Sequence, residues 1–399
     1  MAVRHGYGKV VTDGLVFAYD TGDVINSYKG KPVTNLATAI QSRGGDVVAD
    51  PTDLPDLPKH IAPEVYCSSK IVESTNSWQS LFQYNTAISV ADGERFVVTA
   101  WVYVPEGKTN NRFNINCSVG SSNTGLTQSP NHDIPTGRWV KLLGSYTNNT
   151  GAAVSITSTR LETYTAAEWT GNITCWAANF MIEKSSTVPS AFRGSPATAL
   201  GASRSVSGSL LDLTGNNSVN VANVSFDSTA NIDLDGTNDY IEVADNSLLD
   251  LTTDMSFEFI VNADSSQGNL YPRLIDKSAY LVHITQTSPF TIAQNINTSG
   301  GLRQTALGSA FTAGEYTHIV TTYDGRYGQI FVNGELNYTR DFSTELACTT
   351  NSTSVKFGGN GDTSRPLAGK LPVSKVYNRV LTAGEVKQNF AMYKKRFNI

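Results

Sequence analysis

The chain has 399 residues, which is long enough for roughly two or three domains with hydrophobic cores of their own. A hydrophobic share of 40% and a charged share of 16% are typical of a soluble protein with a polar surface. The formal net charge of −5 provides no broad basic field for nucleic acid or an acidic membrane. No stretch approaches the roughly 18 apolar residues of a membrane span, and the first residues lack the apolar segment of a secretory signal, so we expect neither membrane insertion nor Sec export.

The four cysteines, Cys67, Cys117, Cys175 and Cys348, lie far apart and form no C-x-x-C pair, which argues against a structural zinc site. Three of them fall within residues 65–195, and an odd number cannot all pair there. We therefore expect free, buried thiols, as in a protein that assembles in a reducing cytoplasm.

The first half of the chain begins with a strand signal and continues into a separate β-rich region. Residues 13–20 form an apolar run between turn residues, which predicts a buried strand. Residues 41–64 contain four prolines and little periodicity, which favours an extended connector. Within residues 65–195, aromatic and β-branched runs alternate with turn clusters, which predicts a β-sandwich.

The second half contains the clearest hairpin of the chain, at residues 316–335. Two runs rich in β-branched and aromatic residues end in Asp324-Gly325 and Asn333-Gly334, pairs that suit type I′ turns because both central residues need positive φ. Residues 231–235, 255–261 and 280–284 alternate in the same strand-like fashion.

One helix is predicted at the C-terminus. Residues 382–385, Thr-Ala-Gly-Glu, form a capping box, and apolar residues then recur at helical spacing up to Phe397. One stripe of this helix is expected to pack on a sandwich or on a neighbouring chain.

The order aromatic-x-His, Tyr-Asp-Gly and Val-Asn-Gly-Glu in residues 316–335 resembles the central hairpin of laminin-G-like, concanavalin-type jelly rolls. Residues 13–36 resemble the opening strand and turn of such domains in phage structural proteins. The Leu-x-Asp-x-Thr-Gly-Asn stretch that would follow soon afterwards comes only at residues 210–217, which indicates an insertion of about 160 residues.

The predicted fold is therefore all-β, with two antiparallel jelly-roll sandwiches, one inserted into the other, and a short C-terminal helix. The laminin-G-like domain takes residues 1–40 and 200–399, the insert takes 65–195, and the connector takes 41–64.

The insert resembles a jelly-roll carbohydrate-binding module, which implies sugar binding, because sugar C–H faces stack on exposed aromatic rings. Trp101 and Trp139 lie mid-strand among aliphatic residues and are expected in its core. The sugar-contacting candidates lie in polar surroundings and are Trp78, Trp169, Tyr164 and Glu168.

Laminin-G-like domains also bind Ca²⁺ through Asp and Asn oxygens, the ligands that a hard cation prefers. The candidates here are Asp235, Asn238 and Asp239 in one turn, with Asp362 in a glycine-rich loop. The alternative is that these side chains satisfy only their own turns. The acidic strand of the family corresponds here to residues 372–376, which contain no acid, and this argues against calcium.

We expect no enzymatic activity. The concanavalin-type hydrolases carry closely spaced carboxylates on one strand, and the carboxylates of residues 242–258 lack that spacing. No histidine lies in a nucleophile motif, and His318, which coincides with the strand histidine of the family, is expected to be a packed structural residue.

The resemblance implies a surface-exposed structural protein of a tailed phage virion, such as a fibre, whisker or capsid decoration, that adheres to host-surface glycans in many copies. The expected partners are other virion proteins, the glycan and further copies of the chain, for example in a trimer. Assembly in the host cytoplasm and release by lysis would place it on the virion surface. The alternatives are a purely architectural or cementing protein and a polysaccharide-degrading enzyme.

Overall fold

A computed structural model forms two compact units: unit 1 comprises Met1–Lys29, Val206–Phe226 and Asn231–Ile399, and unit 2 comprises Gly30–Ser205 and Asp227–Ala230. The residues that the structure describes are 9–23, 26–38, 46–48, 67–72, 78–107, 112–120, 122–129, 134–164, 173–185, 203–225, 232–268 and 271–399.

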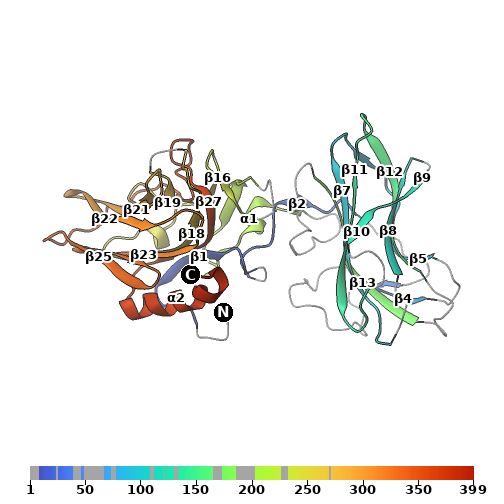
Figure 1. Cartoon of the computed structure of the whole chain (residues 1–399), viewed down its shortest axis with the longest axis horizontal. Helices are drawn as coiled ribbons and strands as arrows, with labels where there is room; N and C mark the ends of the chain where they lie inside the picture. The colour runs from blue at the N-terminus through green and yellow to red at the C-terminus, as the bar shows by residue number, and fades with distance from the viewer. Residues whose placement is uncertain are drawn as a thin grey trace. The chain divides into compact units, whose positions relative to one another are not determined.

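Unit 1 is a sandwich of two antiparallel sheets (Figure 1). Sheet 1 has the order β1 (Leu15–Asp20), β27 (Ala368–Tyr377), β18 (Asp254–Ala263), β23 (Thr317–Asp324), β24 (Tyr327–Val332) and β25 (Glu335–Asp341), with β16 (Leu234–Asp235) also on β27. Sheet 2 has the order β15 (Val219–Asn223), β17 (Tyr240–Val243), β26 (Val355–Phe357), β19 (Arg273–Asp276), β20 (Tyr280–Ile284), β21 (Phe290–Thr298) and β22 (Gly301–Phe311). Two short helical turns, α1 (Val206–Ser209) and η2 (Ser247–Leu249), lie in its connections.

The core of unit 1 lies between these sheets because alternate side chains of each strand point inward. Phe257 and Phe259 of β18 are fully buried there. Phe17 of β1 stacks on Phe357 of β26 with ring centroids 4.9 Å apart, which joins the opening strand to the opposite sheet.

The hairpin predicted at residues 316–335 is formed by β23 and β24, and its two turns differ. Asn333 and Gly334 both have positive φ, as a type I′ turn requires. The Asp324-Gly325 prediction is wrong in detail, because only Gly325 has positive φ. Asp324 instead closes its turn with its carboxylate, which accepts the main-chain N–H groups of Arg326 and Tyr327.

A third layer covers the outer face of sheet 1. The helix α2 (Ala383–Phe397) begins with the predicted capping box, with reciprocal bonds between Thr382 and Glu385. Val386 packs on the sheet beside Val320, and Tyr393 packs beside Ile260. The predicted stripe therefore faces the chain's own sandwich.

Unit 2 has its own core and two antiparallel sheets. One sheet has the order β10 (Thr127–Ser129), β11 (Trp139–Thr147), β7 (Arg95–Tyr103), β13 (Ile173–Ser185), β4 (Cys67–Val72) and β3 (Asp46–Val48). The other has the order β5 (Trp78–Tyr84), β12 (Val154–Tyr164), β8 (Arg112–Val119) and β9 (Ser122–Gly125), with β6 (Ile88–Val90) also on β12.

The two ends of the long segment of unit 2 lie side by side. The strand β2 (Val33–Thr34) pairs with β14 (Ser203–Arg204). On the unit 1 side of the junction, Tyr28 bridges Leu210, and the N–H of Lys29 donates to the carbonyl of Ser209 at 2.8 Å. This arrangement is what an insertion into a single loop requires.

The structure also bears on the predictions for the cysteines, for two tryptophans and for membrane insertion. Cys117, Cys175 and Cys348 are free and buried, as expected. Trp139 packs with the partly buried Trp101 in a small cluster that is separate from the main core of unit 2, because both side chains lie on the opposite face of the sheet from Ala100 and Leu142. The prediction that these two tryptophans lie in the core is therefore wrong. Among the described residues, no helix combines the length and the apolar character that crossing a membrane requires.

Candidate functional site

A buried carboxylate organises the interface between sheet 1 and α2. Glu258, in the middle of β18, has no exposed surface and faces outward, away from the aromatic core. Its oxygens lie 3.0 Å from Nε2 of His318, 3.2 Å from Nζ of Lys375, 3.1 Å from the Tyr377 hydroxyl and 2.7 Å from Nδ2 of Asn389. Strand register produces this cluster, because Lys375 lies directly opposite Glu258 on β27.

The surroundings of Glu258 keep it ionised. Burial by itself would raise its pKa, but the charge of Lys375 and the hydrogen bond and charge of His318 outweigh burial and lower the pKa to about 2. His318 is fully buried, which agrees with its predicted role as a packed structural residue.

The same cluster fastens the N-terminal segment to α2. The amide of Asn389 donates to Glu258, and its Oδ1 accepts the main-chain N–H of Val11 at 2.8 Å. The Tyr377 hydroxyl lies 3.2 Å from the carbonyl of Val11. Residues 9–12, the helix and sheet 1 therefore share one hydrogen-bonded centre.

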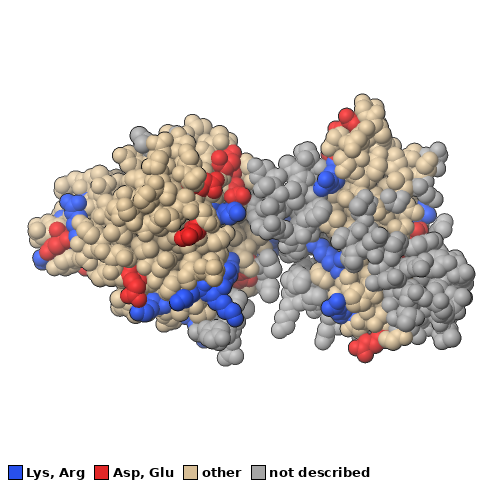
Figure 2. Space-filling view, in the orientation of Figure 1, with Lys and Arg blue, Asp and Glu red and all other residues tan. Residues whose placement is uncertain are grey.

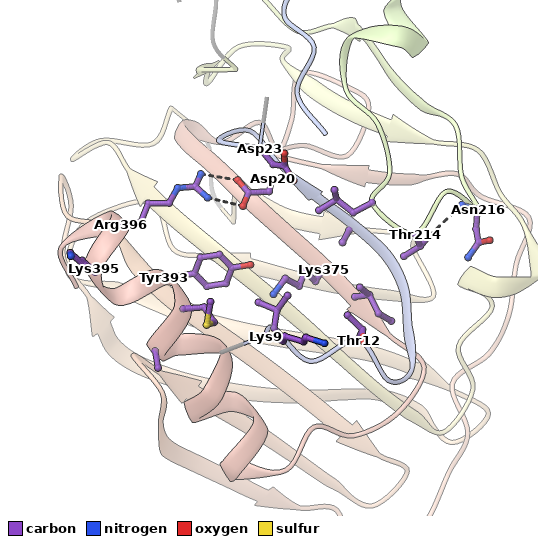
Figure 3. Close-up of a pocket in the computed structure, with 16 residues that line it drawn as sticks. Lys9, Thr12, Asp20, Asp23, Thr214, Asn216, Lys375, Tyr393, Lys395 and Arg396 are labelled. Carbon is purple, nitrogen blue, oxygen red and sulfur yellow. Dashed lines mark hydrogen bonds and ion pairs between the residues drawn. The ribbon is translucent and has the colours of Figure 1, made fainter. Parts of the chain in front are cut away.

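Beside this centre lies a cavity of about 660 Å³, which we call the α2 pocket (Figure 3). Its walls come from the N-terminal segment, β1, the loop at residues 213–216, β27 and α2, all within unit 1. The polar side chains used in the argument below are Lys9, Asp20, Asn216, Lys375, Tyr393 and Arg396.

One wall of the α2 pocket is fixed by a paired carboxylate and guanidinium. Arg396 donates to both oxygens of Asp20, at 2.6 and 2.7 Å (Figure 3). Asp20 also accepts the N–H of Gly22 at 2.8 Å. This bidentate geometry joins the last turn of α2 to the end of β1.

The opposite wall is organised by Asp212, the acid of the Leu-x-Asp-x-Thr-Gly-Asn stretch. Its carboxylate accepts the main-chain N–H groups of Ala18, Thr214, Asn216 and Asn217. These bonds fix the loop and its position against β1. The side-chain amide of Asn216 makes no hydrogen bond within the described part of the chain, and it lines the cavity.

Tyr393 forms the aromatic part of the α2 pocket. Nζ of Lys375 lies 4.7 Å from its ring centroid, and burial raises the pKa of its hydroxyl well above 10. The hydroxyl bonds to no described residue and points into the cavity in Figure 3. It is therefore a neutral group that can donate or accept a hydrogen bond from a ligand.

Basic side chains outnumber carboxylates in the lining of the α2 pocket, and two of them, Lys375 and Arg396, are paired with Glu258 and Asp20. Lys9, Lys375, Lys395 and Arg396 line the pocket, against two carboxylates, Asp20 and Asp23. Figure 2 shows basic side chains gathered along α2, whose last turn contains Lys394, Lys395 and Arg396. A cavity of this size with a few fixed polar groups on apolar walls suits a small polar molecule, such as one or two sugar rings.

The predicted sugar-contacting residues of unit 2 are only partly within the described residues. Trp78 begins β5 and Tyr164 ends β12, and the strand register places these two residues directly opposite each other. Trp169 and Glu168 lie outside the described residues. Sugar binding at these four positions stays a prediction.

The predicted calcium ligands lie in two neighbouring loops of unit 1. Asp235 accepts the N–H groups of Thr237 and Asn238, and Asp239 is buried and accepts the N–H and hydroxyl of Ser225. A Cβ placed on Gly359 would lie 3.3 Å from the carbonyl oxygen of Asp239, so the loop that contains Asp362 passes beside this turn.

Several oxygens of the three Asp candidates accept hydrogen bonds from nearby main-chain groups, which is compatible with the alternative interpretation. Asp362 accepts the N–H of Ser364 at 2.6 Å. Within the described ranges, no three His, Cys, Asp or Glu side chains are grouped as metal ligands. That search leaves out Asn oxygens, so calcium binding stays a prediction.

The cluster of Glu258, Lys375 and Asn389 was not predicted from the sequence. A signal was present, because Glu258 and Lys375 interrupt otherwise apolar strands, at Ser-Phe-Glu-Phe-Ile and Pro-Val-Ser-Lys-Val. Such charges inside a buried strand indicate paired groups.

Residues 235–387 match the family model described as the concanavalin A-like lectin/glucanases superfamily. This match supports the laminin-G-like fold predicted for unit 1. It includes Lys375, whereas the other pocket residues named above, from the N-terminal segment, the 213–216 loop and the end of α2, lie outside it. No curated protein matches the chain.

Solved structures with weak similarity include binding domains. The binding domain of Paraclostridial Mosquitocidal Protein 1 is 17% identical, with a TM-score of 0.39, over 46% of this chain and 49% of that one. The binding domain of Botulinum neurotoxin serotype G is 16% identical, with a TM-score of 0.39, over 47% and 49%. The CBM40 of the Ruminococcus gnavus IT-sialidase, bound to alpha2,3 sialyllactose, is 16% identical, with a TM-score of 0.34, over 39% and 94%. The matched region spans about half the length of the first two chains.

Proposed function

We propose that this chain is a non-enzymatic, surface-exposed structural protein of a tailed phage virion whose lectin-like unit 1 binds a host-surface glycan. The observation that carries the binding proposal is the α2 pocket, a preformed polar cavity in a concanavalin-type sandwich. The phage assignment is supported by the resemblance of residues 13–36 to the opening strand of phage structural proteins.

The α2 pocket favours binding over hydrolysis. The main chain of Asn216 is bonded to Asp212, and the Tyr393 ring packs against Lys375, so both residues are positioned before a ligand enters. A glycosidase needs two carboxyl groups that are free to act on one bond. Asp20 is engaged by Arg396, and Glu258 is sealed beneath the helix by four polar neighbours.

A single site with few polar groups binds a sugar weakly, and copies on one particle multiply its effect. We therefore include in the proposal a closed homo-oligomer, such as a trimer, and contacts with other virion proteins. Calcium at the loop of Asp235 and Asp239 is also part of the proposal, and the binding experiment includes an arm that tests it.

The test is glycan-array binding of the purified chain, in Ca²⁺ and in chelator. Tyr393→Phe removes only the pocket hydroxyl, and Asn216→Ala removes only the amide, so each is expected to weaken binding about tenfold. Tyr338→Phe, on the exposed strand β25, is the matched control and is expected to bind like the unchanged chain. Equal binding by all of these variants would remove the pocket from the proposal, and a chelator effect would support a calcium site.

The virion part of the proposal has a separate test. Antibodies raised against the purified chain are expected to label intact phage particles in electron micrographs. Labelling of lysate debris without labelling of particles would contradict a virion location while leaving sugar binding intact.

One observation favours the architectural alternative. All seven residues of β25 are exposed, at the edge of sheet 1, and Leu336 keeps 48% of its surface accessible. An edge strand with exposed apolar residues is a template for pairing with another chain. Thr339→Pro blocks such pairing, and a lower mass by light scattering in this variant would support a particle-building role.

A further inference from the structure

Tyr271 has an unusual backbone conformation at the start of β19, in sheet 2 of unit 1. Its φ is 60°, and 44% of its surface is exposed. Bulky L residues rarely adopt this conformation because Cβ crowds the backbone, and the following Pro272 restricts the residue before it still further. Strained backbone of this kind persists where surrounding contacts fix it, and it is concentrated at functional sites.

The contacts that fix Tyr271 come from three side chains. Nη1 of Arg273 donates to the Tyr271 carbonyl at 2.8 Å, while its Nε donates to Asp276 at 2.9 Å. The guanidinium carbon of Arg365 lies 5.6 Å from the centre of the Tyr271 ring. The His283 ring meets the Tyr271 ring at 74°, with centroids 5.0 Å apart. The ring is thus held in one orientation while nearly half of the residue stays accessible.

Sheet 2 extends a polar surface away from this ring. Tyr280, Val282 and Ile284 of β20 point into the core, so His283 and Leu281 point outward. Strand register then places Ala293 and Ala306 in the row of His283.

The next row of the outer face contains two amides. Asn295 lies opposite Gln304, and Nε2 of Gln304 donates to Oδ1 of Asn295 at 3.0 Å. Leu281 stands in the same row, opposite Asn295, and Ala293, in the row of His283, is buried.

Burial, followed by the charges of Arg273 and Arg365, lowers the pKa of His283 to about 4, so the imidazole is neutral near pH 7. The ring is buried and its Nδ1 lies 3.5 Å from the carbonyl of Ile284, so His283 holds the Tyr271 ring in place beside the amides.

We propose that Tyr271, His283 and the Asn295–Gln304 pair form a second saccharide-binding surface, on which a pyranose ring stacks on Tyr271 and sugar hydroxyls bond to the amides. An aromatic face beside neutral hydrogen-bonding groups suits an uncharged sugar ring better than a peptide or a nucleic acid. This surface lies on sheet 2, whereas the α2 pocket lies against sheet 1, so the inference does not depend on the pocket. Together the two would let one unit hold two points of a polysaccharide.

The test uses Tyr271→Gly in the full chain, because glycine accepts positive φ and the variant removes the ring while relieving the strain. The probes are two uncharged oligosaccharides, maltohexaose and cellohexaose, titrated by calorimetry. We expect the unchanged chain to bind at least one of them, and Tyr271→Gly to bind it about tenfold more weakly with an equal or higher melting temperature. Gln304→Ala is expected to weaken binding in the same direction.

The matched control is Tyr338→Ala, which removes a tyrosine of similar exposure, 39%, from sheet 1. It is expected to leave the affinity unchanged. The proposal is overturned if no probe binds, if Tyr271→Gly binds like the unchanged chain, or if Tyr271→Gly melts at a lower temperature, since the last result means that the ring supports the fold. Tyr393→Phe distinguishes this proposal from the pocket proposal. If only the pocket proposal fails, Tyr393→Phe binds the probe like the unchanged chain, whereas Tyr271→Gly binds it more weakly.

Discussion

Lys277 has a fully buried side chain, yet it carries an ammonium group at one end of the sandwich of unit 1. Its Nζ donates to Asp245 and to the carbonyls of Asn351 and Thr353, at 3.1 and 2.9 Å for the carbonyls, and lies 3.4 Å from Asp250. The ammonium group of Lys277 therefore binds four oxygens, two from the segment of Asp245 and Asp250 and two from the segment of Asn351 and Thr353.

Replacing Lys277 by Met should lower the free energy of unfolding by about 3–5 kcal/mol, because two carboxylates and two carbonyls lose their shared counter-charge. Urea denaturation measures this loss. Lys387→Met is the control, because the Lys387–Glu335 pair is exposed and should contribute little. A loss for Lys277→Met no larger than that of the control would contradict the assigned role.

Glu258 makes the stability of unit 1 depend on pH in a definite direction. Its folded pKa of about 2 lies below the usual 4.5, so between these values the unfolded chain binds more protons than the folded chain. The contribution of Glu258 is present above about pH 4.5 and is lost as the pH falls towards about 2.

Glu258→Gln should therefore lower stability at pH 7 by about 3 kcal/mol, because Lys375 keeps a buried charge without a partner, and should flatten the fall in melting temperature between pH 5 and pH 2. Calorimetry across this range checks both effects, with Glu335→Gln as an exposed control. If the melting temperature of Glu258→Gln falls as steeply between pH 5 and pH 2 as that of the unchanged chain, other carboxylates are the main cause of the loss of stability in acid.

At the scale of elements, α2 depends on its first turn. Oγ1 of Thr382 accepts the N–H of Glu385 at 3.3 Å, and Glu385 in turn holds Arg379 with bonds of 2.9 and 2.6 Å. Thr382→Ala should cost about 1 kcal/mol in chemical denaturation and leave sugar binding unchanged, because the pocket residues lie at the other end of the helix. Thr382→Ser, which keeps the hydroxyl, should restore most of the loss.

The elements with local signals were the ones that the sequence could predict. The hairpin at residues 316–335 and the helix at residues 383–397 each carry their own periodicity and end signals within a few residues. The turn at Asp324 differed because a side chain replaced the expected backbone conformation, and no rule based on residue pairs distinguishes these two solutions.

The candidate sites were less predictable because they depend on long-range pairing. Glu258 and Lys375 are 117 residues apart in the chain and meet only through the register of β18 and β27. The α2 pocket combines residues from both ends of the chain. The conformation of Tyr271 contradicts local preference, since positive φ predicts Gly or Asn at such a position.

At the scale of the whole molecule, the junction of the two units predicts that unit 1 can fold alone. Tyr28 and Leu210 both belong to unit 1 and pair with each other where the chain leaves and re-enters this unit, so a short Gly-Ser linker can replace residues 30–205 without stretching the chain. The shortened protein should unfold in one cooperative thermal transition and retain the affinity of the α2 pocket. A broad, non-cooperative transition would show that unit 1 needs the insert.

The pairing of Tyr28 with Leu210 also bears on how such a chain changes over generations. Any domain whose own ends lie equally close can occupy this position, and the cores on either side need no compensating substitution. A single recombination event at this loop can therefore give a lineage a new recognition module, while the sandwich that holds it is inherited intact.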